Sequence, residues 1–394
     1  MKIAIIVRKL NIKGGTQRQA IMLARDLKER GHDVALYTFL YAPADCYEAE
    51  LRDLRVVTLG NYPRSSPFLF WKEYNIARKL ALLIDRDTEL LNPHDQVVYR
   101  VAAYFKRGIK NIPSVWMMND LPTKFFSLMR DREMNPASRQ GVIKRILGYV
   151  LDWFDIHRFI AMQDEIAVLD DRDRKWIKTY FHRDAVVVRN GIDGNAFQYG
   201  EHLLPGEKVN LLMTGIFFPH RRFEDGIDAL KLLVDADIDA NLTIIGDYGA
   251  SGYARYIKSH IASLGLESRV TLRGRVTEEE LKAAYQDHDI FLFLSHLQSW
   301  GIAVFEALAS GLPVIVSRTS GASEVLEDCL NALVVDPKHP DQVAQAVMRL
   351  LKNAGLYGQL SKNGRALVEQ KISWKNYADS MLRVFEKAIG QHVT

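Results

Sequence analysis

The chain has 394 residues, 48% hydrophobic and 25% charged with a formal net charge of +4, which predicts a globular protein of two domains. The five apolar residues before Arg8 are too few for a signal-peptide core, and no apolar run approaches the eighteen residues of a membrane span, so we expect a cytoplasmic protein. The two cysteines, Cys46 and Cys329, lie far apart and outside any CxxC spacing, so the sequence suggests neither a disulfide framework nor a thiolate metal site, and we expect both to be structural.

Apolar runs alternate with helix-period segments along the chain. In the first half, strands are predicted at residues 2–7, 32–39 and 113–119, and a helix at 16–31. In the second half the alternation is clearer, with strands predicted at 210–216, 241–247, 270–276, 290–295, 313–318 and 331–336. Helices are predicted at 277–288, 302–310, 340–353 and 374–389.

This rhythm indicates parallel sheets with helices on both faces. Gly, Asn, Asp and Pro cluster over residues 186–208, after a strand, and mark the break between domains. We therefore predict two doubly wound, Rossmann-like α/β domains at 1–193 and 194–372, followed by a terminal helix in 373–394. Such domains bind ligands at the carboxyl ends of their strands, so functional residues are expected there.

The loop "KGGTQRQA" follows the first strand. Gly14 and Gly15 allow close backbone approach, and the helix that follows offers free N–H groups to an anion. The spacing is not GxGxxG, so a dinucleotide fingerprint is absent, and the alternative is an ordinary tight turn.

The segment "GIFFPHRRFED" brings Arg221 and Arg222 to the end of the first strand of the second domain. Paired guanidiniums suit the oxygens of a diphosphate. The alternative is a solvated pair bonded to Glu224 and Asp225.

The segment "SHLQSWGIAVFEALASGLPVI" predicts a strand end, a loop and a helix whose first-turn amides face a ligand. Gln298 lies on the loop, and Glu306 lies in an otherwise apolar helix, where a carboxylate needs a partner such as two ribose hydroxyls. The alternative places Glu306 on a solvent-facing side of that helix.

Polar residues also end two strands of the first domain. His94 and Asp95 follow one strand and Asn119 and Asp120 follow another, where they can bind substrate hydroxyls or cap the next helix. Metal-ligand spacing and a GxSxG elbow are both missing, which disfavours metallohydrolase and serine-hydrolase chemistry.

The first half of the chain is the basic one. Residues 1–200 hold 32 Lys and Arg against 24 Asp and Glu, whereas residues 201–394 hold 20 against 24. This suits an anionic partner such as a membrane surface, but contains no Lys/Arg block typical of nucleic-acid binding. The basic, aromatic segment 140–159 is compatible with peripheral membrane contact and equally with core packing of an amphipathic helix.

The series "GGTQRQAIMLARDLKERGHDV", "VVRNGID", "LTIIGDYG", "LGLESRVTLRGRV", "SHLQSWGIAVFEALASGLPVIVS" and "SGASEVLEDCLNALVVDP" resembles the family-4 glycosyltransferases of GT-B fold. The resemblance spans nearly the whole chain. It implies two Rossmann-like domains facing a cleft, a nucleotide-sugar donor held mainly by the second, a glycan or lipid-linked acceptor held by the first, and a last helix that crosses back. It also implies retention of anomeric configuration, no essential bound metal or other cofactor, and a donor phosphate oxygen that accepts the proton.

Carried over by position, Glu306 would bind the ribose hydroxyls and Gln298 the donor sugar, where the family usually has Glu. The resemblance further assigns the sugar and phosphate to the amides of Gly301, Ile302 and Ala303, and the base to the region from Gly274 to Val276. Gly215 would lie at the phosphate site.

Three positions depart from the family pattern. Gln298 lacks the usual charge, Ile216 stands where an Arg usually follows Gly215, and Asn119 stands where many members have a His facing the donor sugar. Arg221 or Arg222 falls at the site of the diphosphate-binding Lys.

The main hypothesis is therefore a retaining hexosyltransferase of cell-envelope or polysaccharide synthesis that uses a UDP or GDP sugar. The alternative is a nucleotide-sugar-binding protein of the same fold with little turnover. A third hypothesis is an epimerase or a phosphorylase of GT-B fold. A phosphorylase would need a pyridoxal-phosphate lysine, and no motif in the sequence points to one.

Overall fold

The computed structural model describes residues 1–63, 69–119, 142–200, 202, 204–248 and 252–393. The chain divides into two compact units: Met1–Gly191 with Trp374–Thr394 form unit 1, and Ile192–Ser373 form unit 2. These borders lie within two residues of the domain limits expected from the sequence. Among the described residues, none of the helices combines the length and hydropathy needed to cross a bilayer.

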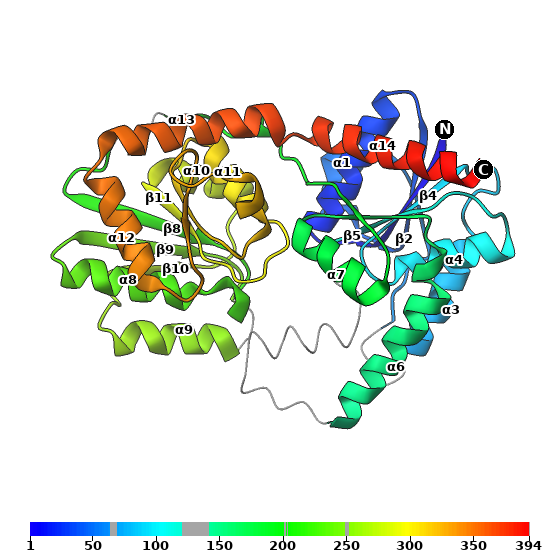
Figure 1. Ribbon diagram of the computed structural model, residues 1–394, viewed down its shortest axis with the longest axis horizontal. Helices are drawn as coiled ribbons and strands as arrows, with labels where there is room; N and C mark the ends of the chain where they lie inside the picture. Colours follow the sequence, from blue (N-terminus) through cyan, green and yellow to red (C-terminus); the bar gives the residue numbers. More distant parts are fainter. Residues whose placement is uncertain (64–68, 120–141, 201, 203, 249–251, 394) are drawn as a thin grey trace. The chain divides into compact units, whose positions relative to one another are not determined.

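Unit 1 is built on a seven-stranded sheet in the order β3-β2-β1-β4-β5-β6-β7, and all neighbouring strands are parallel (Figure 1). Its strands are β1 (Lys2–Leu10), β2 (Asp33–Tyr41), β3 (Arg55–Thr58), β4 (Leu90–His94), β5 (Val115–Met118), β6 (Glu165–Val168) and β7 (Val186–Val187). Its helices are α1 (Gly15–Glu29), α2 (Glu48–Leu51), α3 (Leu69–Ala81), α4 (Val98–Gly108), α6 (Val142–Arg158), α7 (Asp171–Phe181) and α14 (Trp374–Val393). The apolar centre of β1, Ile3 to Val7, is fully buried, as expected for a strand covered on both faces.

Unit 2 is built on a six-stranded parallel sheet in the order β10-β9-β8-β11-β12-β13. Its strands are β8 (Lys208–Thr214), β9 (Asp239–Ile245), β10 (Val270–Arg273), β11 (Ile290–Phe293), β12 (Val314–Ser317) and β13 (Leu333–Val335). Its helices are α8 (Phe223–Asp235), α9 (Gly252–Ser263), α10 (Glu278–Asp287), α11 (Ile302–Ala309), α12 (Pro340–Leu351) and α13 (Ala354–Lys371). The prediction of two doubly wound α/β domains is thus confirmed.

The terminal helix α14 belongs to unit 1, although it follows unit 2 in the chain. It packs on α1, β5 and β6 and buries Trp374, Tyr377, Met381 and Phe385. The return of the last helix to the first domain, which the family resemblance implied, is therefore present.

Candidate functional site

The carboxyl ends of the unit 2 strands share one edge, because all of them run parallel. The strand order reverses between β8 and β11, since β9 and β10 extend the sheet on one side of β8 and the later strands extend it on the other. Open α/β sheets bind their ligands at such a switch point. The predicted residues Gly215, Arg221, Gln298 and Gly301 all lie on the two loops that flank it.

The loops at this edge are joined by hydrogen bonds. The backbone N–H of His296, after β11, donates to the carbonyl oxygen of His220, after β8, at 2.7 Å. The N–H of Gly321, after β12, donates to the carbonyl oxygen of Gln298 at 2.7 Å. The loops that follow β8, β11 and β12 therefore hold one another in place.

Arg221 and Arg222 are adjacent in sequence but lie in different surroundings. Arg222 pairs with Glu224, whose carboxylate lies 2.6 Å from Nη1, and with Asp225, which accepts from Nε at 2.9 Å. The Arg221 guanidinium makes no hydrogen bond or ion pair with the part of the chain that the structure describes, and its Nε is buried. Burial lowers the pKa of Arg221 to about 10. Arg222 thus takes the structural role left open by the sequence, and Arg221 is the cation available to a ligand.

Gly215 lies directly against this cation. Its φ is +148°, and a Cβ atom there would lie 3.1 Å from Nε of Arg221. A Cβ atom at Gly246, after β9, would collide with the carbonyl oxygen of Gly215. The two glycines let the ends of β8 and β9 approach closely. The importance of Gly246 was not predicted from the sequence.

The start of α11 presents backbone amides at the same edge. Gly301 precedes the helix with φ +149°, and a Cβ atom there would lie 2.8 Å from the ring of Phe293. The helix has no side-chain cap, so the first-turn amides, which include Ile302 and Ala303, are not satisfied by a capping side chain. This arrangement provides donors and the positive end of a helix dipole for an anionic or hydroxyl-rich ligand.

Glu306 is buried at 8% exposure, which excludes the solvent-facing alternative. Its Oε2 accepts a hydrogen bond of 3.1 Å from the hydroxyl of Tyr285, a residue of α10. Tyr285 is fully buried, and burial raises its pKa. The carboxylate expected to bind ribose is therefore oriented by a buried tyrosine, which was not predicted from the sequence.

The remaining predicted residues of unit 2 lie on the same strand-end edge. The side chain of Gln298 is half-buried and follows Leu297, whose φ is +58°. Gly274 and Val276 follow β10, and a Cβ atom at Gly274 would be in ordinary contact with the ring of Tyr248. Because β9 and β8 separate β10 from β11, these two residues lie farther from the switch point than Gly301 does.

In unit 1 the strand order reverses between β1 and β4. Gly14 and Gly15 follow β1, and α1 begins at Gly15, one residue earlier than predicted. Gly14 has φ −137°, so its backbone does not require glycine, but a Cβ atom would lie 2.6 Å from Oε1 of Gln17. The space above Gly14 is thus occupied by a flexible side chain that donates to the carbonyl oxygen of Lys9.

His94 and Asn119 are brought together by Gln19, a fully buried residue of α1. Asn119 Nδ2 donates to Gln19 Oε1 at 2.8 Å, and His94 Nδ1 lies 3.1 Å from the same oxygen. Gln19 Nε2 in turn donates to Oδ1 of Asn190, and His94 Nε2 lies 2.7 Å from Oδ1 of Asn92. We call Gln19, Asn92, His94, Asn119 and Asn190 the amide cluster.

His94 is fully enclosed in this cluster, and burial lowers its pKa to about 3, so it is neutral near pH 7. It is placed to orient Gln19 rather than to expose its own ring. The Oδ1 atom of Asn119 is buried and has no partner in the described part of the chain, while Asp120 lies outside the described residues. Gln19 could have been found from its position on the buried stripe of α1, four residues before Leu23 and eight before Leu27.

Two family models match the chain in succession. Glycosyltransferase Family 4 matches residues 13–195, and Glycosyl transferases group 1 matches residues 196–367. The chain is a family-4 glycosyltransferase of GT-B fold.

Similar proteins span the full length of this glycosyltransferase. An uncharacterized glycosyltransferase of Methanocaldococcus jannaschii is 25% identical, and the MMP α-(1→4)-mannosyltransferase of Mycolicibacterium hassiacum is 24% identical, each with 99% of both chains covered. The solved structure of Anabaena HepE in complex with UDP has a TM-score of 0.74 at 15% identity and covers 98% of this chain and 100% of its own. This structural likeness supports the fold.

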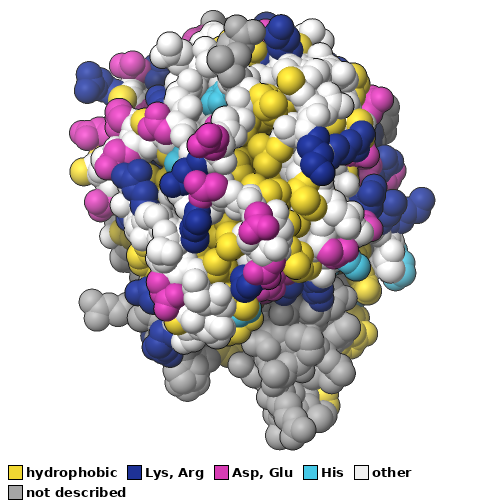
Figure 2. Space-filling view, turned by 90° about the vertical axis from the view of Figure 1, so that its left-hand side faces the viewer, with side chains coloured by type: hydrophobic (Ala, Val, Ile, Leu, Met, Phe, Trp, Pro, Cys, Tyr) yellow, Lys and Arg dark blue, Asp and Glu magenta, His cyan; other side chains and the backbone are white. Residues whose placement is uncertain are grey.

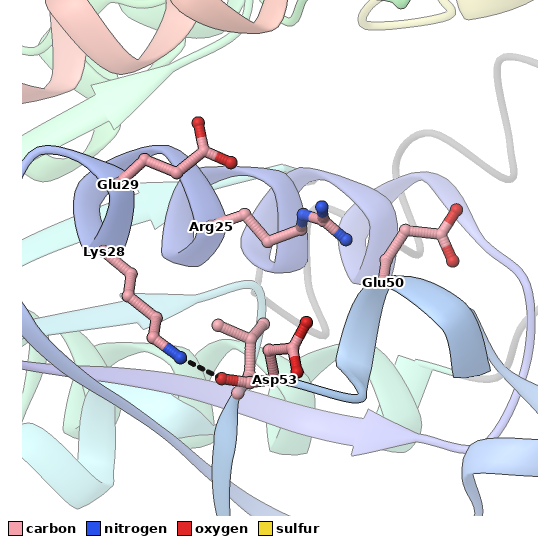
Figure 3. A pocket seen from close by; sticks show the side chains of 6 residues that line it. Arg25, Lys28, Glu29, Glu50 and Asp53 are labelled. Carbon is pink, nitrogen blue, oxygen red and sulfur yellow. Dashed lines mark hydrogen bonds between the residues drawn. The ribbon is translucent and has the colours of Figure 1, made fainter.

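The glycosyltransferase also has a surface pocket of about 360 Å³ away from the strand-end loops. Figure 3 shows that Arg25, Lys28 and Glu29 of α1 line it together with Glu50 and Asp53. These residues lie near the carboxyl end of α1, whereas the predicted anion site lies at its amino end. Cations and carboxylates alternate around this pocket, so it is a poor candidate for the donor site.

Proposed function

We propose that this glycosyltransferase binds a UDP or GDP sugar at the β8–β11 edge of unit 2 and transfers the sugar, with retention, to a hydroxyl of a glycan or lipid-linked acceptor. The acceptor would be an intermediate of cell-envelope or polysaccharide synthesis on the cytoplasmic side of the membrane. The observation that carries this proposal is Arg221, which lies against Gly215 at the switch point without a carboxylate partner.

A buried cation without a counterion is costly, and a ligand diphosphate would supply the missing charge. A guanidinium can donate two parallel hydrogen bonds to phosphate oxygens, which suits a nucleoside diphosphate leaving group. Arg222 cannot do this without taking from Glu224 and Asp225 the cation that pairs with them. Arg221 therefore replaces both the family Lys and the Arg that Ile216 displaces, and it removes the need for a resident metal or cofactor.

The other donor contacts follow from the loops that flank Arg221. The amides of Ile302 and Ala303 would bind phosphate and sugar oxygens, and Glu306, held by Tyr285, would accept hydrogen bonds from the ribose hydroxyls. Gln298 would contact the sugar through a neutral amide, whose hydrogen bond is worth about 1 kcal/mol against roughly 1.5–3 for a charged one.

Transfer would form a bond between the acceptor oxygen and the anomeric carbon while the bond from that carbon to the diphosphate breaks. The acceptor proton would pass to a donor phosphate oxygen, and Arg221 would stabilise the negative charge on the departing diphosphate. Two comparisons support a nucleotide donor and an α-linked product: HepE is solved with UDP, and the Mycolicibacterium relative is named an α-(1→4)-mannosyltransferase.

Unit 1 would supply the acceptor side. The buried Oδ1 of Asn119 and the amide cluster behind it form a neutral hydrogen-bonding group at the β4–β5 end of the sheet. Such a group suits sugar hydroxyls, which both donate and accept.

The test is calorimetric titration of UDP, GDP and ADP without added metal, on the wild type and on Glu306→Gln. Tight binding of UDP or GDP, weakened at least tenfold by the substitution, is the expected result. If none of the three nucleotides binds, the proposed donor site is wrong. A donor that binds but never releases nucleoside diphosphate with any acceptor would favour the non-catalytic binding protein instead, for which the neutral Gln298 is the specific argument.

A further inference from the structure

Helix α6 exposes large apolar side chains and buries two carboxylates, although its Leu151 and Ile156 pack against the core of unit 1. Its inward stripe contains Gly148, Asp152 and Asp155, and the two carboxylates are each only 6% exposed. Its outward face carries large apolar side chains that are 43–59% exposed, namely Ile146, Leu147, Tyr149, Val150, Trp153 and Phe154. Exposed apolar patches of this kind mark interaction surfaces in soluble domains.

The orientation is fixed by a buried ion-pair network. Arg100 of α4 donates to Asp155 through Nε at 3.0 Å and through Nη2, and its Nη1 donates to Glu73 of α3 at 3.4 Å. The hydroxyls of Tyr74 and Tyr99 also donate to Asp155, at 2.6 and 2.9 Å. Turning α6 over would take Asp155 away from the buried Arg100 and leave it with Glu73 alone, so this ion pair holds the apolar face outward.

The neighbouring helix α3 extends the same surface. Its Trp71 is 70% exposed, and the rings of Tyr74 and Phe154 meet with centroids 6.0 Å apart, so α3 and α6 lie side by side, as Figure 1 also shows. We call the outward apolar side chains of α6 together with Trp71 the α3/α6 face.

The exposed charges on the helices of this face have one sign. Among the described side chains of α3, α4 and α6, every carboxylate is buried, whereas several cations are exposed: Lys72, Arg78, Lys79, Arg107 and Arg158. By contrast, the face of the molecule in Figure 2 carries cationic and anionic side chains interspersed around apolar ones. The α3/α6 face combines exposed aromatic side chains with helices on which no described carboxylate is exposed.

We propose that the α3/α6 face docks peripherally on an anionic lipid bilayer, with its aromatic and aliphatic side chains at the headgroup boundary and its cations on the lipid phosphates. Tryptophan and tyrosine favour that boundary, and exposed Lys and Arg gain roughly 1 kcal/mol each near an anionic surface. This inference rests on the proposed function in one respect, namely that the acceptor is lipid-linked. A protein partner would need complementary carboxylates, and a bilayer supplies the negative charge and the apolar layer together.

The experiment is co-sedimentation of the full chain with vesicles of phosphatidylcholine alone and with 30% phosphatidylglycerol. The wild type should bind only the anionic vesicles and should be released by 0.5 M NaCl, which screens exposed charges. Lys72→Glu/Arg78→Glu should weaken binding by at least about 25-fold, since each cation contributes about fivefold. Trp71→Ser/Trp153→Ser should weaken binding without changing its salt dependence.

Leu232→Ser is the matched control, because Leu232 is an exposed apolar residue of α8 in unit 2 and should leave vesicle binding unchanged. The proposal is overturned if the wild type does not bind anionic vesicles, or if neither double variant differs from Leu232→Ser. It is also overturned if the double variants only convert a dimer into a monomer, since the face would then bind a second copy.

Nucleotide titration of each protein in the absence of vesicles separates the two proposals. Retained UDP or GDP binding by the double variants would show that any loss of vesicle binding comes from the surface rather than from unfolding. Vesicle binding by a wild type that binds no nucleotide would support the membrane surface while refuting the donor site.

Discussion

Replacing Arg221 with Met should stabilise the protein and weaken its affinity for the donor nucleotide. The guanidinium lies against Gly215 with a buried Nε and without a carboxylate among the described residues. The fall of its pKa from 12.5 to about 10 corresponds to about 3 kcal/mol. Because the side chain keeps some exposure, we expect the substitution to increase the free energy of unfolding by about 1–3 kcal/mol. The substitution should be stabilising because burial disfavours the charged guanidinium, which the folded chain carries at every pH below 10.

The same substitution should weaken UDP or GDP binding by about 10- to 150-fold, the equivalent of one lost charge-assisted hydrogen-bonding group worth roughly 1.5–3 kcal/mol. Arg222→Met is the matched control and should behave in the opposite way. It leaves Glu224 and Asp225 without their cation and should lower stability by about 3 kcal/mol. Its effect on nucleotide affinity should be small.

The assays are chemical denaturation, which gives the free energy of unfolding, and calorimetric nucleotide titration. If Arg221→Met lowers stability as much as Arg222→Met does, Arg221 has a structural partner and the argument from its missing counterion is wrong. If Arg221→Met leaves nucleotide affinity unchanged, the phosphate assignment is wrong even when the stability result holds.

Three further predictions concern the backbone, the amide cluster and the network under α6. Gly301→Ala should lower the free energy of unfolding by about 2 kcal/mol, because the φ of +149° at Gly301 and the adjacent ring of Phe293 leave no room for a Cβ atom. Chemical denaturation would measure this loss, and an unchanged midpoint would contradict the prediction. His94 has a folded-state pKa of about 3 against an ordinary 6.5, so between these values only the unfolded chain binds the proton and stability falls as the pH drops below 6.5. The contribution of His94 to this loss should be about 2 kcal/mol at pH 5, so His94→Gln should lose that much less than the wild type, and the exposed-residue control His182→Gln should lose as much as the wild type. Asp155→Ala should cost about 3–5 kcal/mol, because it leaves Arg100 buried with its main partner removed, and the double variant Asp155→Ala/Arg100→Met should recover part of that loss.

The sequence predicted the sheets more reliably than it predicted the partners of individual side chains. Continuous apolar runs such as Ile3 to Val7 identify buried parallel strands without further context, whereas β7 has only two residues and gives no such signal. The sequence could not separate Arg221 from Arg222, because the distinction depends on the left-handed backbone at Arg222, φ +56°, which turns that side chain toward Glu224 and Asp225.

Two further features required the fold. The link from His94 to Asn119 passes through Gln19 on α1, and these three residues are far apart in sequence. The orientation of α6 was left open by its amphipathic pattern, since the pattern does not show which side packs inward. The position of Arg100 on α4 decides it, because a buried guanidinium requires Asp155 to face the interior.

The return of α14 to unit 1 has a consequence for biosynthesis. Unit 1 is encoded in two separated stretches, and its helix α1 remains uncovered until Trp374–Val393 has left the ribosome, after all of unit 2 has been translated. Translation that stops before Trp374 would yield a chain with a complete unit 2 and an exposed apolar surface on α1, β5 and β6. The first domain to be started is therefore the last to be completed.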